Sequence, residues 1–165
     1  MATTDILIRS ATRADAAAIT AIYNQAVLGS TATFDLEPET VTARRLWLRS
    51  AGTRLCLVAE VGERVVGWSS LSRWSPRGGY DRTVEASIYV APETQRAGVG
   101  LALAGAALEA APGLNVHAVI AQICAENSAG LALADALGFA RVGTLHEVGR
   151  KFGRPLDVVI CERLV

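Results

Sequence analysis

The segment from residue 83 to residue 110 constrains the fold most, because it joins a strand, a glycine-rich turn and an apolar helix. Residues 83–90 (TVEASIYV) are rich in β-branched and aromatic residues, as strands are. The helix is expected to begin near Gly98 and to end near Ala110. Glycines at 98 and 100 leave the backbone bare, so free N–H groups and the positive end of the helix dipole can face an anion such as a pyrophosphate. The same spacing also suits a simple tight turn.

Two common nucleotide-binding motifs fit this turn less well. It has no Gly-Lys-Ser/Thr ending of a P-loop, and Leu103 occupies the place of the third glycine in the dinucleotide fingerprint. The glycines therefore indicate either an anion-binding turn of another kind or a tight turn that binds no anion.

The whole chain alternates between strand-like and helix-like segments without a repeat, linker or low-complexity tract. Strands are expected at 5–9, 54–61, 64–74, 83–90, 116–123, 140–148 and 156–163. Helices are expected from a start signal at Thr12–Asp15 to about 27, from Pro38 in a first turn to about 50, from 98 to 110 and from 127 to 137. This order predicts one mixed α/β domain, of α+β type, over residues 1–165.

Two segments carry more specific expectations. The nearly continuous apolar run at 116–123 is typical of a central strand covered on both faces. Residues 28–36 (LGSTATFDL) predict a loop whose one aromatic residue, Phe34, walls a pocket.

The balance of charge argues against binding of a polyanion by overall electrostatic attraction. The chain has 16 Lys plus Arg against 16 Asp plus Glu, so bulk electrostatic binding of nucleic acid or an anionic membrane is not expected. The first ten residues (MATTDILIRS) lack the basic start and apolar run of a secretory signal, and glycines interrupt the apolar stretch at 97–108. We therefore expect a cytoplasmic protein without a membrane segment.

Cysteines and histidines give no support for a metal site. Cys56, Cys124 and Cys161 lie far apart with apolar neighbours and without Cys-x-x-Cys spacing, which predicts small core residues in a reducing compartment. His117 and His146 have no partner at ligand spacing, so no metal is expected.

The element Gln95-x-x-Gly98-x-Gly100 follows a strand, and an Asn127 to Gly138-Phe139 segment comes about thirty residues later. Together they resemble the acetyl-CoA-binding core of the GNAT superfamily of N-acetyltransferases. Further blocks at 22–35, 83–90, 125–139 and 148–159 are similar to its phosphinothricin acetyltransferase branch. Members of that branch acetylate the α-amino group of phosphinothricin, methionine sulfoximine or methionine sulfone.

The resemblance covers nearly the whole chain and implies both a fold and a set of cofactor contacts. The fold would be a mixed, mostly antiparallel sheet of about seven strands with about four helices. One strand would offer main-chain hydrogen bonds to the pantetheine arm, and the turn would hold the pyrophosphate with its backbone. Asn127 would bind the arm near the thioester, although a helix N-cap alone also accounts for it. The expected acetyl-CoA contacts are Ile88, Tyr89, Val90, Gln95, Arg96, Ala97, Gly98, Val99, Gly100, Leu101 and Asn127.

Acetyl transfer needs a neutral amine, whereas a primary amine is mostly protonated at neutral pH, so a general base is useful. The resemblance assigns that role to Glu85, and burial beside the cofactor would raise its pKa. A solvated or ion-paired strand residue is the alternative. The superfamily further implies that a main-chain N–H near Val90 meets the oxyanion.

Three positions depart from the pattern. Ala134 stands where many superfamily members have a tyrosine that protonates the thiolate and where the branch has histidine, so the general acid is left open. Solvent can supply this proton, because the CoA thiol is acidic enough. Ala86 and Pro155 replace a histidine and a tryptophan that are common in the branch.

The acceptor pocket is expected to combine Phe34 with the loop before the catalytic strand. Cations and aromatic surface there suit a substrate carboxylate, although such arginines also suit a solvated loop face. The expected substrate-binding residues are Phe34, Arg73, Trp74, Gly78, Gly79, Tyr80 and Arg82. The Lys151-Phe152-Gly153 segment matches the branch and is expected either at the site or at a dimer contact.

The sequence hypothesis is an N-acetyltransferase that acts by direct transfer in a ternary complex, without an acyl-cysteine because no cysteine falls near the expected site. Its expected partner is a small-molecule amine, and the resemblance also implies a homodimer, since members of the family often form dimers. Two alternatives stay open: the acceptor is another small amine, such as a polyamine or a different amino acid, or the chain is an acetyl-CoA-binding module without turnover.

Overall fold

The computed structural model of the chain describes residues 5–165, so the first four residues of the segment searched for a secretory signal lie outside it. Four α-helices are present in this range: α1 (Ala16–Gly29), α2 (Val41–Trp47), α3 (Val99–Ala110) and α4 (Ser128–Ala136). The strands are β1 (Ile6–Ser10), β2 (Thr53–Val61), β3 (Arg64–Arg73), β4 (Thr83–Val90), β5 (Ala118–Cys124), β6 (Ala140–Lys151) and β7 (Arg154–Leu164). Their order along the chain is the predicted one.

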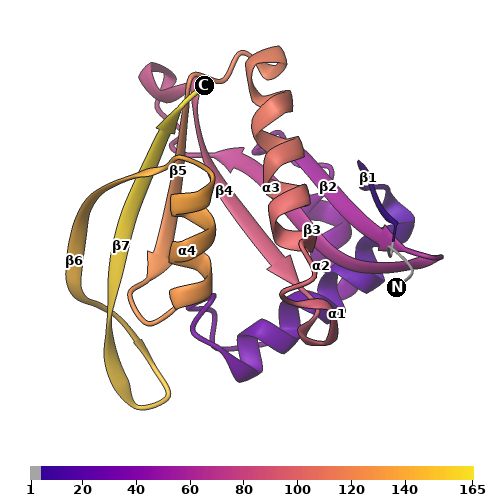
Figure 1. The fold of residues 1–165 in the computed structure, drawn as a ribbon, viewed down its shortest axis with the longest axis horizontal. Coiled ribbons are helices and arrows are strands. Elements are labelled where there is room, and N and C mark those ends of the chain that lie inside the picture. The colour runs from indigo at the N-terminus through magenta and orange to yellow at the C-terminus, as the bar shows by residue number, and fades with distance from the viewer. Residues whose placement is uncertain (1–4) are drawn as a thin grey trace.

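All seven strands belong to one sheet, in the order β1-β2-β3-β4-β5-β7-β6. Every neighbouring pair is antiparallel except β4 and β5, which confirms the expected mixed, mostly antiparallel sheet. The parallel pair is short, because Thr83–Glu85 pairs with Ala118–Ile120 and the two strands then separate (Figure 1). The sheet is therefore split between its two halves toward the carboxyl ends of β4 and β5.

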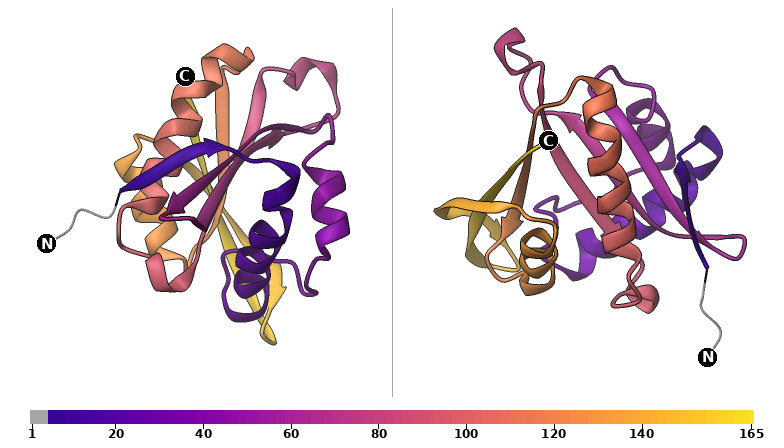
Figure 2. Two further views of the ribbon diagram at one scale, coloured as in Figure 1. Left: turned by 90° about the vertical axis from the view of Figure 1, so that its right-hand side faces the viewer. Right: turned by 45° about the horizontal axis from the view of Figure 1, so that its top comes forward.

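Helices cover both faces of the sheet, with α1 and α2 on one face and α3 and α4 on the other (Figure 2). The alternation of β4 divides its side chains between these faces. Val84 and Ile88 pack in the cluster under α3, whereas Tyr89 packs with Tyr23 of α1 and Trp68 of β3. The two faces of β4 thus belong to two separate cores.

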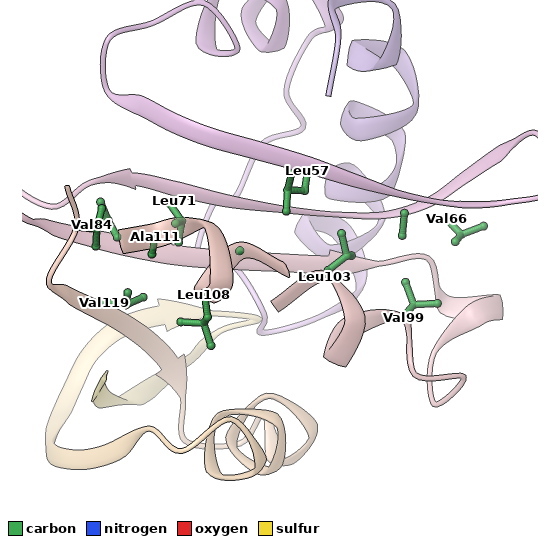
Figure 3. Close-up of a cluster of buried hydrophobic side chains, with 12 residues drawn as sticks. Leu57, Val66, Leu71, Val84, Val99, Leu103, Leu108, Ala111 and Val119 are labelled. Carbon is green, nitrogen blue, oxygen red and sulfur yellow. The ribbon is translucent and has the colours of Figure 1, made fainter. Parts of the chain in front are cut away.

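The larger core lies between α3 and the sheet (Figure 3). Leu103 is fully buried there, together with Val84 of β4 and Val119 of β5. The helix approaches β3 closely at Gly67, where an added Cβ would lie 3.0 Å from Leu103 Cδ1 and 3.1 Å from Val99 Cγ1. This packing fixes where α3 begins, which positions the turn that precedes it.

The C-terminal strands form a long hairpin with a tight turn. Phe152 and Gly153 both have positive φ, of 51° and 76°, as a two-residue turn of type I′ requires. A register shift between Leu145 and Gly149 interrupts the pairing of β6 with β7. The turn expected at Lys151-Phe152-Gly153 is confirmed, but both strands extend further toward it than predicted.

Two local expectations are wrong. The second helix begins at Val41 rather than at Pro38, because Thr40 is its N-cap and accepts a 3.1 Å hydrogen bond from the Ala43 N–H. The strand β5 is not covered on both faces, since Gln122 near its end is exposed. Gln122 lies beyond the last β5 residue that pairs with β4, where the two strands separate.

The expectation for the cysteines agrees with the fold. Cys56, Cys124 and Cys161 are all buried and free, as predicted. Among the helices of residues 5–165, none is both long and apolar enough to cross a membrane.

Replacing Leu103 by alanine tests the core under α3. We expect the Leu103→Ala change to lower the free energy of unfolding by about 2–5 kcal/mol, because it leaves a cavity in a fully buried position. Leu101→Ala is the matched control in the same helix, since Leu101 is 51% exposed, and should change it by about 0.5 kcal/mol or less. Urea denaturation measures the free energy of unfolding of both variants. Equal losses of stability in the two variants would contradict the buried position of Leu103.

Candidate active site

A cavity of about 1240 Å³ opens where β4 and β5 separate. Its walls come from the end of α1 and the following loop, both diverging strands, α3, α4 and the β6–β7 hairpin. The cavity therefore reaches both faces of the split sheet. Eleven of the residues expected at the site line it: Phe34, Glu85, Ile88, Tyr89, Val90, Gln95, Arg96, Gly98, Gly100, Leu101 and Asn127.

One wall is the open edge of β4. Pairing with β5 stops after Glu85, so the main-chain groups of residues 86–90 that face β5 have no strand partner. Unpaired strand edges bind extended ligands that carry their own amide groups. One main-chain acceptor of β4 already has a side-chain partner: the Val90 carbonyl accepts a 3.2 Å hydrogen bond from Gln95 Nε2.

A second wall is the N-terminus of α3. Gly98 is the helix N-cap and has a φ of 84°, which favours glycine, and its carbonyl accepts the hydrogen bond of the Ala102 N–H. The first N–H groups of the helix have no acceptor within it and are free for an anion. An added Cβ at Gly100 would make only ordinary contacts, 3.4 Å from Leu133 and 3.8 Å from Val90. Glycine at 98 is thus required by the backbone, whereas glycine at 100 mainly leaves the cavity open.

Two residues expected at this turn do not line the cavity. Val99 is 1% exposed and its side chain belongs to the core under α3. Ala97 is exposed outside the cavity. At both positions only the main chain remains available to a ligand, because the side chains lie outside the cavity.

Asn127 is the N-cap of α4 and lines the cavity as well. Its Oδ1 accepts a 3.0 Å hydrogen bond from the Gly130 N–H. An added Cβ at Gly130 would lie 2.7 Å from Asn127 Nδ2, so glycine is needed for this cap. The cap uses the amide oxygen and leaves the Nδ2 donor for a ligand. Gly130 was not singled out from the sequence, although Asn-x-x-Gly was a readable signal.

Glu85 lies at the last paired position of β4, where the split begins. Burial raises the pKa of its carboxyl group, and a hydrogen bond from Gln122 acts in the opposite direction. In this bond Gln122 Nε2 donates to Glu85 Oε1 over 3.1 Å. Sequence reasoning did not select Gln122, whose only signal was one polar residue in an apolar strand.

The loop after α1 forms the wall that contains Phe34. The Phe34 ring lies directly on β6, because a Cβ at Gly149 would be 2.0 Å from Phe34 Cε2. On the other side, the Tyr23 hydroxyl donates a 2.5 Å hydrogen bond to Asp35 Oδ2 and contacts Thr33 Oγ1 at 2.9 Å. The loop is thus held between α1 and a strand more than a hundred residues away in the sequence.

Lys151 adds a third attachment for this loop. It is 3% exposed, and its Nζ donates a 2.7 Å hydrogen bond to the Thr33 carbonyl. Burial lowers the pKa of this ammonium group. The next residue, Phe152, lines the cavity. The structure therefore places the Lys151-Phe152-Gly153 segment at the cavity wall.

The loop before β4 does not reach the cavity. It precedes the first residue of β4, at the end of the strand opposite to Val90, and two of its arginines have local partners. Arg73 Nη2 pairs with Asp81 Oδ1 at 2.9 Å, and Arg82 Nε donates to the Asn115 carbonyl at 3.4 Å. Six expected substrate-binding residues consequently lie apart from Phe34: Arg73, Trp74, Gly78, Gly79, Tyr80 and Arg82.

Other side chains occupy the cavity where these arginines were expected. Its lining arginines are Arg96 and Arg154, and Arg154 forms an ion pair with Glu126. Ala134 also lines the cavity and offers no proton donor. The expectation that no cysteine lies near the site is wrong, because Cys124 at the end of β5 is part of the wall.

A Gly149→Ala change tests the attachment of Phe34. The added methyl group overlaps the ring, so we expect a loss of about 1–3 kcal/mol in the free energy of unfolding and a displaced Phe34. Gly143→Ala on the same strand is the control, since a Cβ there has no neighbour within 4 Å. Chemical denaturation and the aromatic NMR signals of Phe34 report the two effects. An unmoved Phe34 in the Gly149 variant would refute the contact.

Comparison with known proteins places this site in a family. Residues 8–160 match the family described as acetyltransferase (GNAT) domain. An L-methionine sulfoximine/L-methionine sulfone acetyltransferase of Pseudomonas paraeruginosa is 34% identical, with 94% of this chain and 92% of the relative covered. A phosphinothricin N-acetyltransferase of Streptomyces coelicolor is also 34% identical, with 98% and 97% covered.

A solved structure agrees with these sequence matches. The phosphinothricin acetyltransferase of Sinorhizobium meliloti, determined in complex with AcCoA, has a TM-score of 0.93 and 31% sequence identity, covering 97% of this chain and 88% of its own. The chain therefore belongs to the GNAT family of acetyltransferases.

Proposed function

We propose that this enzyme transfers the acetyl group of acetyl-CoA directly to the α-amino group of a small amino acid of the methionine sulfone, methionine sulfoximine or phosphinothricin type. One observation carries the proposal: a single cavity joins the anion-binding start of α3 to the half-buried Glu85 at the strand split. Relatives with these substrates in their names match the chain over more than nine-tenths of its length.

The donor side of the cavity fits the chemistry of coenzyme A. The free N–H groups at the start of α3, around Gly98 and Gly100, suit a pyrophosphate. The open edge of β4 from Ile88 to Val90 suits the amide groups of the pantetheine arm. The Nδ2 donor of Asn127 adds a hydrogen bond near the arm. These contacts are mostly with the main chain, so a chain without net charge can make them.

The acceptor side is the part of the cavity bounded by Glu85, Phe34 and Phe152. When acetyl-CoA is bound, its thioester supplies the acyl carbon that the amine attacks. The amine must first lose a proton, and Glu85 accepts it in its ionised form. A raised pKa makes this carboxylate a stronger base. As the new C–N bond forms the C–S bond breaks, and solvent in the open cavity provides the proton for the thiolate.

A thiol-release assay tests this function. We expect the purified protein with acetyl-CoA to release CoA thiol in the presence of methionine sulfone, methionine sulfoximine or phosphinothricin, with a kcat/KM on the order of 10⁴ M⁻¹s⁻¹ or more for the best of them. Polyamines and unmodified amino acids serve as comparison acceptors. Absence of thiol release with all three named acceptors would contradict the proposal, and a preference for polyamines would change the substrate class.

The Glu85→Gln change tests the base. We expect kcat/KM to fall by about 10²–10⁴-fold, because the amide cannot accept the proton, while acetyl-CoA binding measured by calorimetry stays unchanged. In the wild type, kcat/KM should fall as pH decreases through a pKa above the usual range of glutamate, since burial disfavours the ionised form. Glu109→Gln, on the exposed side of α3, is the control. An unchanged rate for the Glu85 variant would exclude this role.

A further inference from the structure

Gln122 occupies a position that the strand split defines. The last paired row of β4 and β5 joins Glu85 to Ile120. Residues two apart on a strand point to the same face, so Gln122 is the first β5 side chain beyond the split on the face of Glu85. Both side chains line the cavity, and the hydrogen bond between them spans the gap that opens between the strands.

The chemistry of the pair determines how the Gln122 amide is oriented. An ionised carboxylate only accepts hydrogen bonds, so the nitrogen end of the amide must face Glu85, as the 3.1 Å contact between Nε2 and Oε1 shows. The amide oxygen is then directed away from the carboxylate. Among the hydrogen bonds of residues 5–165, none uses this oxygen or Glu85 Oε2. Two acceptor atoms, the amide oxygen of Gln122 and Oε2 of Glu85, are thus available to a ligand in the cavity.

A primary ammonium group carries three N–H donors, which matches such a pair of acceptors. We propose that Gln122 positions the Glu85 carboxylate and that its amide oxygen, together with this carboxylate, forms the binding site for the primary amine of the acceptor. The proposal rests on the proposed function, which it deepens by naming the residues that recognise the reacting group. Gln122 is a positioning residue for Glu85 and a binding residue for the amine.

Within residues 5–165, burial and the Gln122 hydrogen bond act on the pKa of Glu85, and no charged side chain is among these causes. The facing positions are Ser72 on β3 and Ile120 on β5, and neither titrates. On the face of Glu85, the titratable groups of the same strands are Tyr89 on β4, whose ring packs in the α1 core, and Cys124 on β5. On the next strand, Glu162 of β7 lies opposite Ile120. From the loop before β4, Arg82 is directed to the Asn115 carbonyl. The Gln122 amide is therefore the neighbour whose removal most directly changes the proton affinity of Glu85.

A Gln122→Leu variant tests the proposal by kinetics. A donor to a carboxylate stabilises the charged form, so its loss should move the acidic limb of the kcat/KM profile upward by about one pH unit. The KM for the amine should rise about tenfold from the lost acceptor, with acetyl-CoA affinity unchanged. Gln122→Glu should move the same limb further upward, because two carboxylates then share the site. A purely structural role would leave the pH profile where it is.

Direct titration of Glu85 separates this proposal from the proposed function. The carboxyl ¹³C signals of the labelled full chain, with Glu85→Gln used for assignment, report the pKa of Glu85 without any turnover. We expect this pKa to be higher in Gln122→Leu than in the wild type and unchanged in the control Gln25→Leu, which removes another cavity-lining glutamine on α1.

Each outcome has one meaning. An equal Glu85 pKa in wild type and Gln122→Leu overturns the positioning role even if the wild type acetylates its acceptor. If the pH profiles of kcat/KM for wild type and Gln122→Leu coincide and the KM for the amine is unchanged, the proposed amine-binding role of Gln122 is wrong. A shifted pKa in a protein without acetyl transfer supports the positioning of Glu85 and refutes only the proposed function.

Discussion

The separation of β4 from β5 after the Glu85–Ile120 pair is the constraint on which the rest of the structure depends. A fully paired sheet would satisfy its own main-chain groups and leave no passage between its faces. The split leaves the β5-facing edge of β4 open and creates the cavity between the helix layers. Glu85 is the last paired residue of β4 before this split, where its side chain is half-buried and still lines the cavity.

Two cores on opposite faces of the sheet position the walls of the cavity. On one face α3 packs against β3 at Gly67, which places its N-terminus beside the open edge of β4. On the other face Arg44 is buried among the rings of Tyr23, Trp47 and Trp68, and it pairs with Glu39. That cluster supports the loop that carries Phe34. The donor and acceptor sides of the cavity thus depend on different cores.

Most of the fold could be predicted from local patterns, because alternation, helical spacing and turn residues act within a few residues of each other. The strand 83–90 and the turn before α3 were located correctly, and so was the tight turn at Phe152-Gly153. Predictions failed where a distant element decided the outcome. The exposed Gln122 lies on β5 beyond the last residue that pairs with β4, and the loop before β4 lies at the paired end of that strand, away from the split.

The sequence by itself determined the order of elements, the glycine that the start of α3 needs at position 98 and the cap at Asn127, since each depends on the backbone preferences of neighbouring residues. Only the tertiary structure decided that Gln122 contacts Glu85 and that Lys151 and Gly149 hold the Phe34 loop. Such contacts join residues 37 to 118 positions apart. They arise from strand register and helix packing, which no local pattern specifies.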